Sequence, residues 1–180
     1  MEIPLRIRIL LWWKIIFRRK NNQSELVKIG EDGQGVATIL FLLPAEKEYA
    51  QIAGYFVKED FDNQLRQIHY VVHKNGLRFY PDQLKPNIIT FNDKDLNFLG
   101  GLVSKSILDR IRSIEYDALV DLNQSLDQTL SLLSLELDIP VKIGFQSPIS
   151  DKLYTLEIQK STKGFLEQTY ETIERLLGLV

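Results

Sequence analysis

The sequence predicts a three-layer α/β/α sandwich in a single domain, built on a mostly parallel, doubly wound sheet. In the stretch 116–145, YDALVDLNQSLDQTLSLLSLELDIPVKIGF, an apolar run, leucines at helical spacing and a second apolar run follow one another. This order is typical of a strand, a covering helix and a parallel strand. Strand-like and helix-like segments also alternate along the rest of the chain. Finally, 180 residues that are 44% hydrophobic can bury one core.

Three strands and two helices are expected before this central unit. Residues 36–43, VATILFLL, are short, apolar and closed by Pro44, which is typical of a buried strand. Apolar residues on one side of 44–60, with acids in the first turn, predict a helix. The remaining segments are predicted as follows: a strand at 68–72, a loop at 76–86 that packs over an edge of the sheet, a strand at 87–91 and a helix at 102–114.

The central unit is predicted to contain a strand at 118–122, a helix from Leu126 to Leu137 that ends before Pro140, and a strand at 141–145. Alternating side chains then predict a last strand at 154–158, and amphipathic spacing predicts a closing helix at 165–177. Residues 36–180 are therefore expected to form a Rossmann-like domain.

Residues 1–20 are expected to form a basic amphipathic helix, and the polar, glycine-rich residues 21–35 a connector. The first 20 residues carry a net charge of +5, whereas the remaining 160 carry −7. The apolar run at 9–17 is about half the roughly 20 residues that span a membrane. Cations follow it where a signal peptide has small residues, so neither a transmembrane helix nor a signal peptide is predicted.

Two interpretations of the N-terminal helix stay open. It packs on the domain, or it lies on the inner face of a membrane with its tryptophans at headgroup depth and its cations on anionic lipid. The cations scatter around a helical wheel, which favours packing. The residues that would contact the membrane are Arg6, Arg8, Trp12, Trp13, Arg18, Arg19 and Lys20.

Several kinds of site are not expected. The chain has no cysteine, and His69 and His73 would lie about 13 Å apart on one strand, too far to share a metal ion. The glycines at 30–35 precede a strand, whereas a dinucleotide-binding loop needs them after one. No Walker loop and no nucleophile-elbow triad occurs, and the acidic body does not suit nucleic acid. No cofactor, metal or nucleic acid is therefore predicted.

A ligand site is predicted beyond the carboxyl ends of the strands, where open α/β sheets collect their ligands. Polar side chains follow three of the predicted strands at this edge. They are Glu46, Lys47, Glu48, Asp121, Asn123, Gln124, Ser125 and Gln146. The alternative is that these residues serve only the helices, with Asn123 or Ser125 as an N-cap and the acids at 46 and 48 on a helix dipole.

Two resemblances attach to particular segments. The run EYDALVDL followed by a helix and VKIGF is similar to the N-terminal domain of family 9 glycosyltransferases, the lipopolysaccharide heptosyltransferases. Together with FNDKDLNFLGG and YTLEI, the same run resembles an uncharacterised family found mainly in Bacteroidota. The first resemblance implies an acceptor-side domain whose catalytic base follows the first strand, and the second implies no activity.

The departures from the glycosyltransferase pattern weigh against catalysis. The resemblance implies a glycine-aspartate turn after the first strand, but here PAEKEYAQ stands there, with Tyr49 near the expected aspartate and Glu46 or Glu48 as the available acids. We therefore expect a non-catalytic cytoplasmic domain that binds a protein partner or a small ligand. The alternatives are one component of a split glycosyltransferase and a degenerate remnant of such an enzyme.

Overall fold

The computed structural model describes residues 36–57, 66–159 and 166–179, and these contain a single six-stranded sheet whose strands are all parallel. The strand order is β3-β2-β1-β4-β5-β6, so the chain first winds outward from β1 and then restarts from β4 in the other direction. This confirms the predicted doubly wound fold. The strands are β1 (Thr38–Leu42), β2 (Gln67–His73), β3 (Ile88–Phe91), β4 (Ala118–Asp121), β5 (Val141–Phe145) and β6 (Leu156–Ile158).

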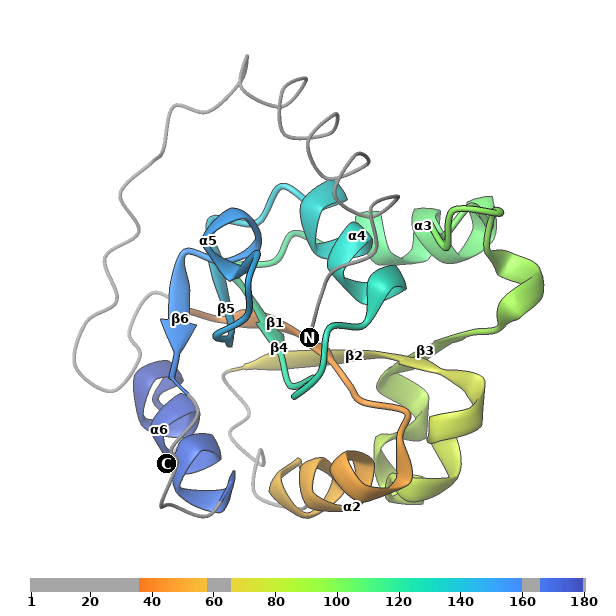
Figure 1. Ribbon diagram of the computed structural model, residues 1–180. Coiled ribbons are helices and arrows are strands. Elements are labelled where there is room, and N and C mark those ends of the chain that lie inside the picture. The colour runs from red at the N-terminus through yellow and green to blue at the C-terminus, as the bar shows by residue number, and fades with distance from the viewer. Residues whose placement is uncertain (1–35, 58–65, 160–165, 180) are drawn as a thin grey trace.

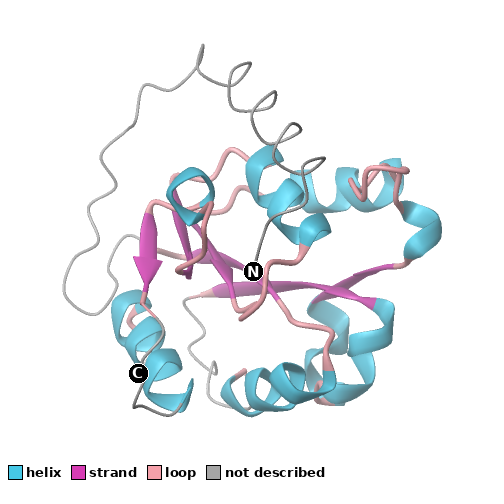
Figure 2. Cartoon of the chain, viewed as in Figure 1, coloured by secondary structure: helices cyan, strands magenta, loops and turns pink. Residues whose placement is uncertain are grey.

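Helices cover both faces of the sheet, as Figures 1 and 2 show. One face carries α2 (Lys47–Phe56) and α6 (Leu166–Leu177). The opposite face carries α3 (Lys105–Arg112), α4 (Gln128–Glu136) and the short α5 (Ser150–Leu153). The three layers follow from the alternation of strands and helices, since each parallel connection must pass over one face.

The apolar strand runs exist because the sheet is buried on both sides. In β1, Ile39 and Phe41 pack toward α2 and α6, whereas Leu40 and Leu42 pack toward α3 and α4. Helix α4 is buried on more than one side, because Leu132 and Leu135 also pack on α5. This explains why leucines fill its sequence at more positions than a single helical stripe requires.

Two segments differ from the prediction. Residues 76–86 were expected to be a loop at a sheet edge, but they lie in two 3-10 helices, η2 (Lys74–Phe79) and η3 (Asp82–Asn87). Their apolar side chains, Leu77, Phe79 and Leu84, cover the same core as α2, and so they take the place of a longer crossover helix. The loop before β6 likewise contains α5, and β6 begins two residues later than predicted because Tyr154 is the C-cap of α5.

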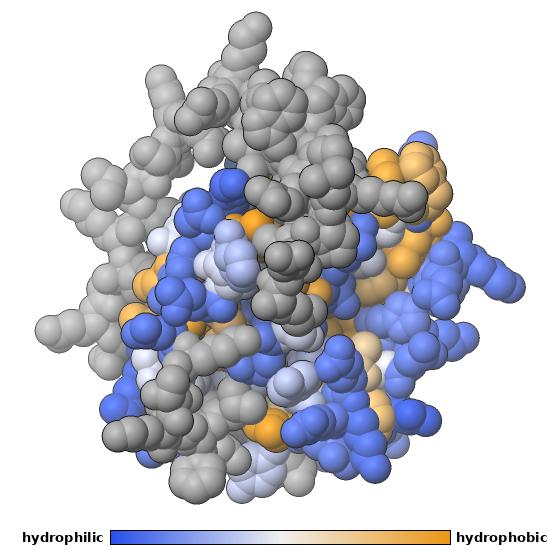
Figure 3. Space-filling model, viewed as in Figure 1, coloured by the Kyte–Doolittle hydropathy of each residue, from blue (hydrophilic) through white to orange (hydrophobic). Residues whose placement is uncertain are grey.

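Most of the face in Figure 3 is hydrophilic where its residues are described, with a hydrophobic group at the loop before α3. Phe98 and Val103 of that loop are exposed. None of the helices in the described ranges is long and apolar enough to cross a membrane. The predicted helix at 1–20, with its proposed membrane contacts, and the connector at 21–35 lie outside the described residues.

Candidate functional site

A cavity of about 210 Å³ lies beyond the carboxyl ends of β1 and β4, the two strands at which the winding reverses. One wall is the segment after β1 and the first turn of α2, and the other is the segment that joins β4 to α4. We call this hollow the switch-point cavity. It is lined by Pro44, Ala45, Glu46, Tyr49, Asn123, Gln124, Ser125, Leu126, Asp127 and Gln128.

The wall after β1 is held in place by Tyr80, the residue that follows η2. The Tyr80 hydroxyl donates to the Pro44 carbonyl at 2.6 Å, and burial raises the pKa of Tyr80, so this hydroxyl keeps its proton. Glu46 is the residue before α2 and its side chain makes no capping hydrogen bond, although it lines the cavity. All three residues at 46–48 are exposed, but Lys47 and Glu48 line neither this cavity nor the smaller hollow described below.

The wall after β4 is organised by Asp127 and Asn123. The side chain of Asp127 accepts a hydrogen bond from the Leu130 amide at 2.8 Å and is the N-cap of α4. The prediction that Asn123 or Ser125 caps this helix is therefore wrong. The chain runs on for two residues beyond Ser125 before it turns helical, and the Asn123 amide instead donates to the Leu42 carbonyl at 3.3 Å, which ties the ends of β1 and β4 together.

A smaller hollow of about 20 Å³ lies on the other side of the segment after β4, against the loop after β5. We call it the inner chamber. It shares 123–126 with the switch-point cavity as a common wall, and its other lining residues are Asp121, Ser131, Phe145, Gln146, Ser147 and Tyr154. The two hollows together therefore involve six of the eight predicted residues. Whether these residues bind a ligand stays a prediction.

Asp121 is a buried carboxyl group at the end of β4, with 3% of its surface exposed. Its Oδ1 accepts hydrogen bonds from the backbone and side-chain amides of Asn123 at 2.9 and 2.7 Å, and its Oδ2 accepts one from the Tyr154 hydroxyl at 2.6 Å. Burial raises the pKa of Asp121 to about 6, against the opposing effect of these three bonds. At neutral pH the carboxylate is therefore mostly ionised.

Tyr154 reaches Asp121 because residue 144 has no side chain. A Cβ placed on Gly144 would lie 2.3 Å from the Tyr154 ring, so the ring lies directly over the β5 backbone. Burial and the charge of Asp121 raise the pKa of Tyr154, which therefore stays a hydrogen-bond donor. A glycine inside a strand is a known signal of such a close approach. Gly144, inside the predicted strand at 141–145, was therefore the signal available in the sequence.

Two other buried polar residues were missed, one beside the site and one toward the opposite edge of the sheet. Ser131, on the first turn of α4, is 2% exposed and its hydroxyl has no hydrogen-bond partner among the described residues. Lys142, the second residue of β5, donates to the Ser134 and Leu137 carbonyls toward the end of α4. In the sequence, a lysine inside an apolar strand was a signal that could have identified Lys142. Nothing in the sequence distinguishes Ser131 from the other serines of α4.

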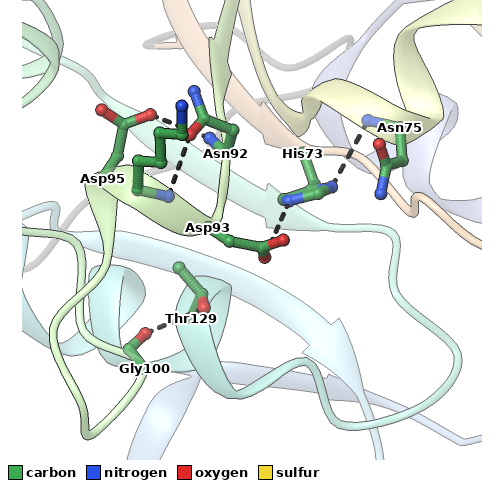
Figure 4. Close-up of polar contacts among 8 residues, drawn as sticks. His73, Asn75, Asn92, Asp93, Asp95, Gly100 and Thr129 are labelled. Carbon is green, nitrogen blue, oxygen red and sulfur yellow. Dashed lines mark hydrogen bonds and ion pairs between the residues drawn. The ribbon is translucent and has the colours of Figure 1, made fainter.

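Polar contacts at the ends of β2 and β3 stabilise the loops that follow these strands (Figure 4). Asn92 and Asp95 form a reciprocal capping box, and Nε2 of His73 lies 3.4 Å from Asp93. The Thr129 hydroxyl donates to the Gly100 carbonyl and so joins this loop to α4. The part of the chain that the structure describes holds no group of three potential metal-ligating side chains.

These features define a class of protein: a single-sheet, doubly wound α/β domain with polar hollows at its switch point. A model of DUF6913, a family of unknown function, matches residues 14–177, and the chain belongs to that family. No curated protein matches the sequence. A solved structure described as "The FMN binding protein AtHal3" is similar at 15% identity, with a TM-score of 0.39, over 78% of this chain and 77% of that one. The resemblances to heptosyltransferases and to Bacteroidota proteins stay predictions.

Proposed function

We propose that this domain is a binding module for a small polar molecule, about the size of a hexose, that is neutral or positively charged and occupies the switch-point cavity. The observation that carries the proposal is the position of a polar cavity at the point of the fold where doubly wound sheets bind their ligands. Its volume is about 210 Å³, against about 20 Å³ for the inner chamber.

The charge of the lining supports a ligand that is not anionic. Glu46 and Asp127 contribute carboxylates, and the described residues around the cavity include no lysine, arginine or histidine. Phosphate groups in folds of this kind bind the free amides of a helix N-terminus. Here Asp127 already binds an amide at the start of α4, and Glu46 and Glu48 stand at the start of α2. A phosphate at the N-terminus of either helix would therefore be repelled by carboxylates.

Amides and hydroxyls supply the specificity in this proposal. Asn123, Gln124, Ser125 and Gln128 all line the cavity, and their side chains suit the hydroxyl and amino groups of a sugar-like molecule. Among the described residues that line the cavity, no nucleophile is hydrogen-bonded to a base, so binding without catalysis is the simplest role. Regulation or delivery of the bound molecule would then depend on a partner.

A matched series of probes tests this proposal. We would measure the thermal unfolding midpoint of the full-length protein with glucosamine, glucose, glucose 6-phosphate and FMN at equal ionic strength. A ligand that binds only the folded state raises the midpoint with concentration. Glucosamine is expected to stabilise most, glucose less, and the two phosphates not at all. Stabilisation by the phosphates alone, or by none of the probes, would overturn the proposal.

The matched variants are Glu46→Gln and Glu48→Gln. Both remove one acid from the start of α2, but only Glu46 lines the cavity. Glu46→Gln should weaken glucosamine binding about tenfold, as expected when one charged hydrogen-bond partner is lost. Glu48→Gln should leave it unchanged. Equal effects of the two variants would place the binding site elsewhere.

A further inference from the structure

We infer that the inner chamber is a separate binding site for one small positive group, either a potassium or ammonium ion or the primary ammonium of a larger molecule. This site goes beyond the proposed function, because it lies on the other side of the segment after β4 and is formed with the loop after β5. Three features support this site: a buried carboxylate, a buried hydroxyl without a partner among the described residues, and a small hollow that both residues line.

The negative charge belongs to Asp121. Among the described residues it has no salt-bridge partner, and its three hydrogen bonds all come from neutral groups. Asp127 lies close enough to add to the negative potential. A buried carboxylate without a cation is costly, so a cation that enters the chamber gains the attraction that the protein does not itself satisfy.

The residues that line the chamber also have hydrogen-bonding positions that are not used among the described residues. An ionised carboxylate has about four acceptor positions, and three are used on Asp121. Ser131, Ser147 and Tyr154 all carry hydroxyl oxygens and line the same chamber, and the hydroxyl of Ser131 has no partner among the described residues. These are oxygen ligands, which suit hard cations, and an ammonium group can donate to the same atoms.

Size and charge select the guest. The hollow is partly open to solvent, and its volume of about 20 Å³ has room for one particle of about the radius of water, roughly 1.4 Å. Potassium and ammonium are close to this size, and a quaternary ammonium is much larger. Asp121 is the one carboxylate among the described lining residues, and this matches a single positive charge better than a divalent ion, for which several carboxylates are usual.

The test is a cation titration of the full-length protein at constant ionic strength, made up with tetramethylammonium chloride. We would follow the unfolding midpoint and the carboxyl carbon resonance of Asp121 by NMR. Potassium or ammonium chloride is expected to raise the midpoint saturably and to move the Asp121 resonance. Ethanolamine is compared with choline. If ethanolamine acts and the inorganic ions do not, the guest is the ammonium of a larger molecule.

Two buried serines of α4 provide the matched variants. Ser131 and Ser134 are both buried and both lack a hydrogen-bond partner for the hydroxyl, but only Ser131 lines the chamber. Ser131→Ala should weaken cation binding about tenfold, whereas Ser134→Ala should not change it. Glu46→Gln should also leave it unchanged, which separates this site from the switch-point cavity.

Absence of any saturable effect of the small cations and of ethanolamine would overturn the inference. So would an effect that Ser131→Ala and Ser134→Ala reduce equally, because the cation would then act through the general stability of α4. An effect of choline equal to that of ethanolamine would mean that the site is open to large groups, and would also contradict a chamber of this size.

Discussion

Asp121 shows how one residue combines a structural and an electrostatic role. Its carboxylate orders the turn after β4 through Asn123 and holds Tyr154 across β5, yet it does so at a buried position that disfavours its charge. The folded state therefore binds a proton at this group more tightly than the unfolded chain does. The consequence can be measured in the pH dependence of stability.

We predict that Asp121 makes the protein lose stability as the pH rises from about 4 to about 6. The pKa of Asp121 is raised from 3.8 to about 6 in the folded state, so in this window the folded protein holds a proton that the unfolded chain has lost. The free energy of unfolding should fall by about 3 kcal/mol across the window, at roughly 1.4 kcal/mol for each pKa unit.

The Asp121→Asn variant isolates this effect, since contributions from other acids cancel in the difference between the two proteins. Urea denaturation between pH 4 and pH 7, in tetramethylammonium buffer, should show the variant gaining stability relative to the wild type as the pH rises. A stability difference that is independent of pH, or that changes in the opposite direction, would show that burial does not raise the pKa of Asp121.

Other individual residues could be predicted from the sequence only in part. Glu46, Asn123, Gln124 and Ser125 were selected because they follow strands, and they do line the switch-point cavity. The same argument selected Lys47 and Glu48, which do not line the cavity, because strand order alone cannot say which residues of a helical turn face it. Tyr154 was missed since its role depends on crossing Gly144, a contact between different elements.

At the scale of elements, the N-terminus of α4 decides what the switch point can bind. A free helix N-terminus attracts anions, but here the cap is itself an acid, Asp127. The sequence places several capping residues in the run 123–127, and their propensities do not distinguish among them. The bond from the Leu130 amide to Asp127 identifies the one that is used.

Removal of this cap gives a direct test. Asp127→Ala should lower the free energy of unfolding by about 1 kcal/mol, because one amide of α4 loses its partner. Ser125→Ala serves as the control and should change stability by much less. Chemical denaturation of both variants at neutral pH measures the difference. If Ser125→Ala were the more costly change, α4 would begin earlier than the structure places it.

The elements that were predicted well are those with a strong apolar pattern. The strands at 38–42, 88–91, 118–121 and 141–145 are buried on both faces, so burial alone specifies them. The 3-10 helices between β2 and β3 were missed because their apolar residues are few and are interrupted by Pro81 and Pro86. Short helices of this kind are selected by the core that they cover more than by local preference.

At the scale of the whole molecule, the sheet order follows from the same patterns. Parallel connections are right-handed, so the alternation of strands and helices leaves few possible windings. The reversal between β1 and β4 then brings together two loops that are about 80 residues apart in sequence, as the bond from Asn123 to Leu42 shows. The class of fold could therefore be predicted, and with it the edge of the sheet where a site would lie.

The ligand could not be predicted in the same way. Its chemistry depends on which carboxylates, amides and hydroxyls face each hollow, and this is set by packing between elements. The charge of the switch-point cavity, with Glu46 and Asp127 and no basic residue among its described lining, became visible only once the loops were placed. The separate inner chamber depends on Tyr154 and Ser131 in the same way.

The measurement that tests the central claim most directly is a map of amide chemical shifts in the full-length protein during titration with glucosamine and, separately, with glucose 6-phosphate. We predict saturable shifts with glucosamine that are concentrated at residues 45–49 and 123–128, and none there with the phosphate. Shifts that are stronger with the phosphate, or that glucosamine produces only elsewhere in the domain, would contradict a switch-point site for neutral or cationic ligands.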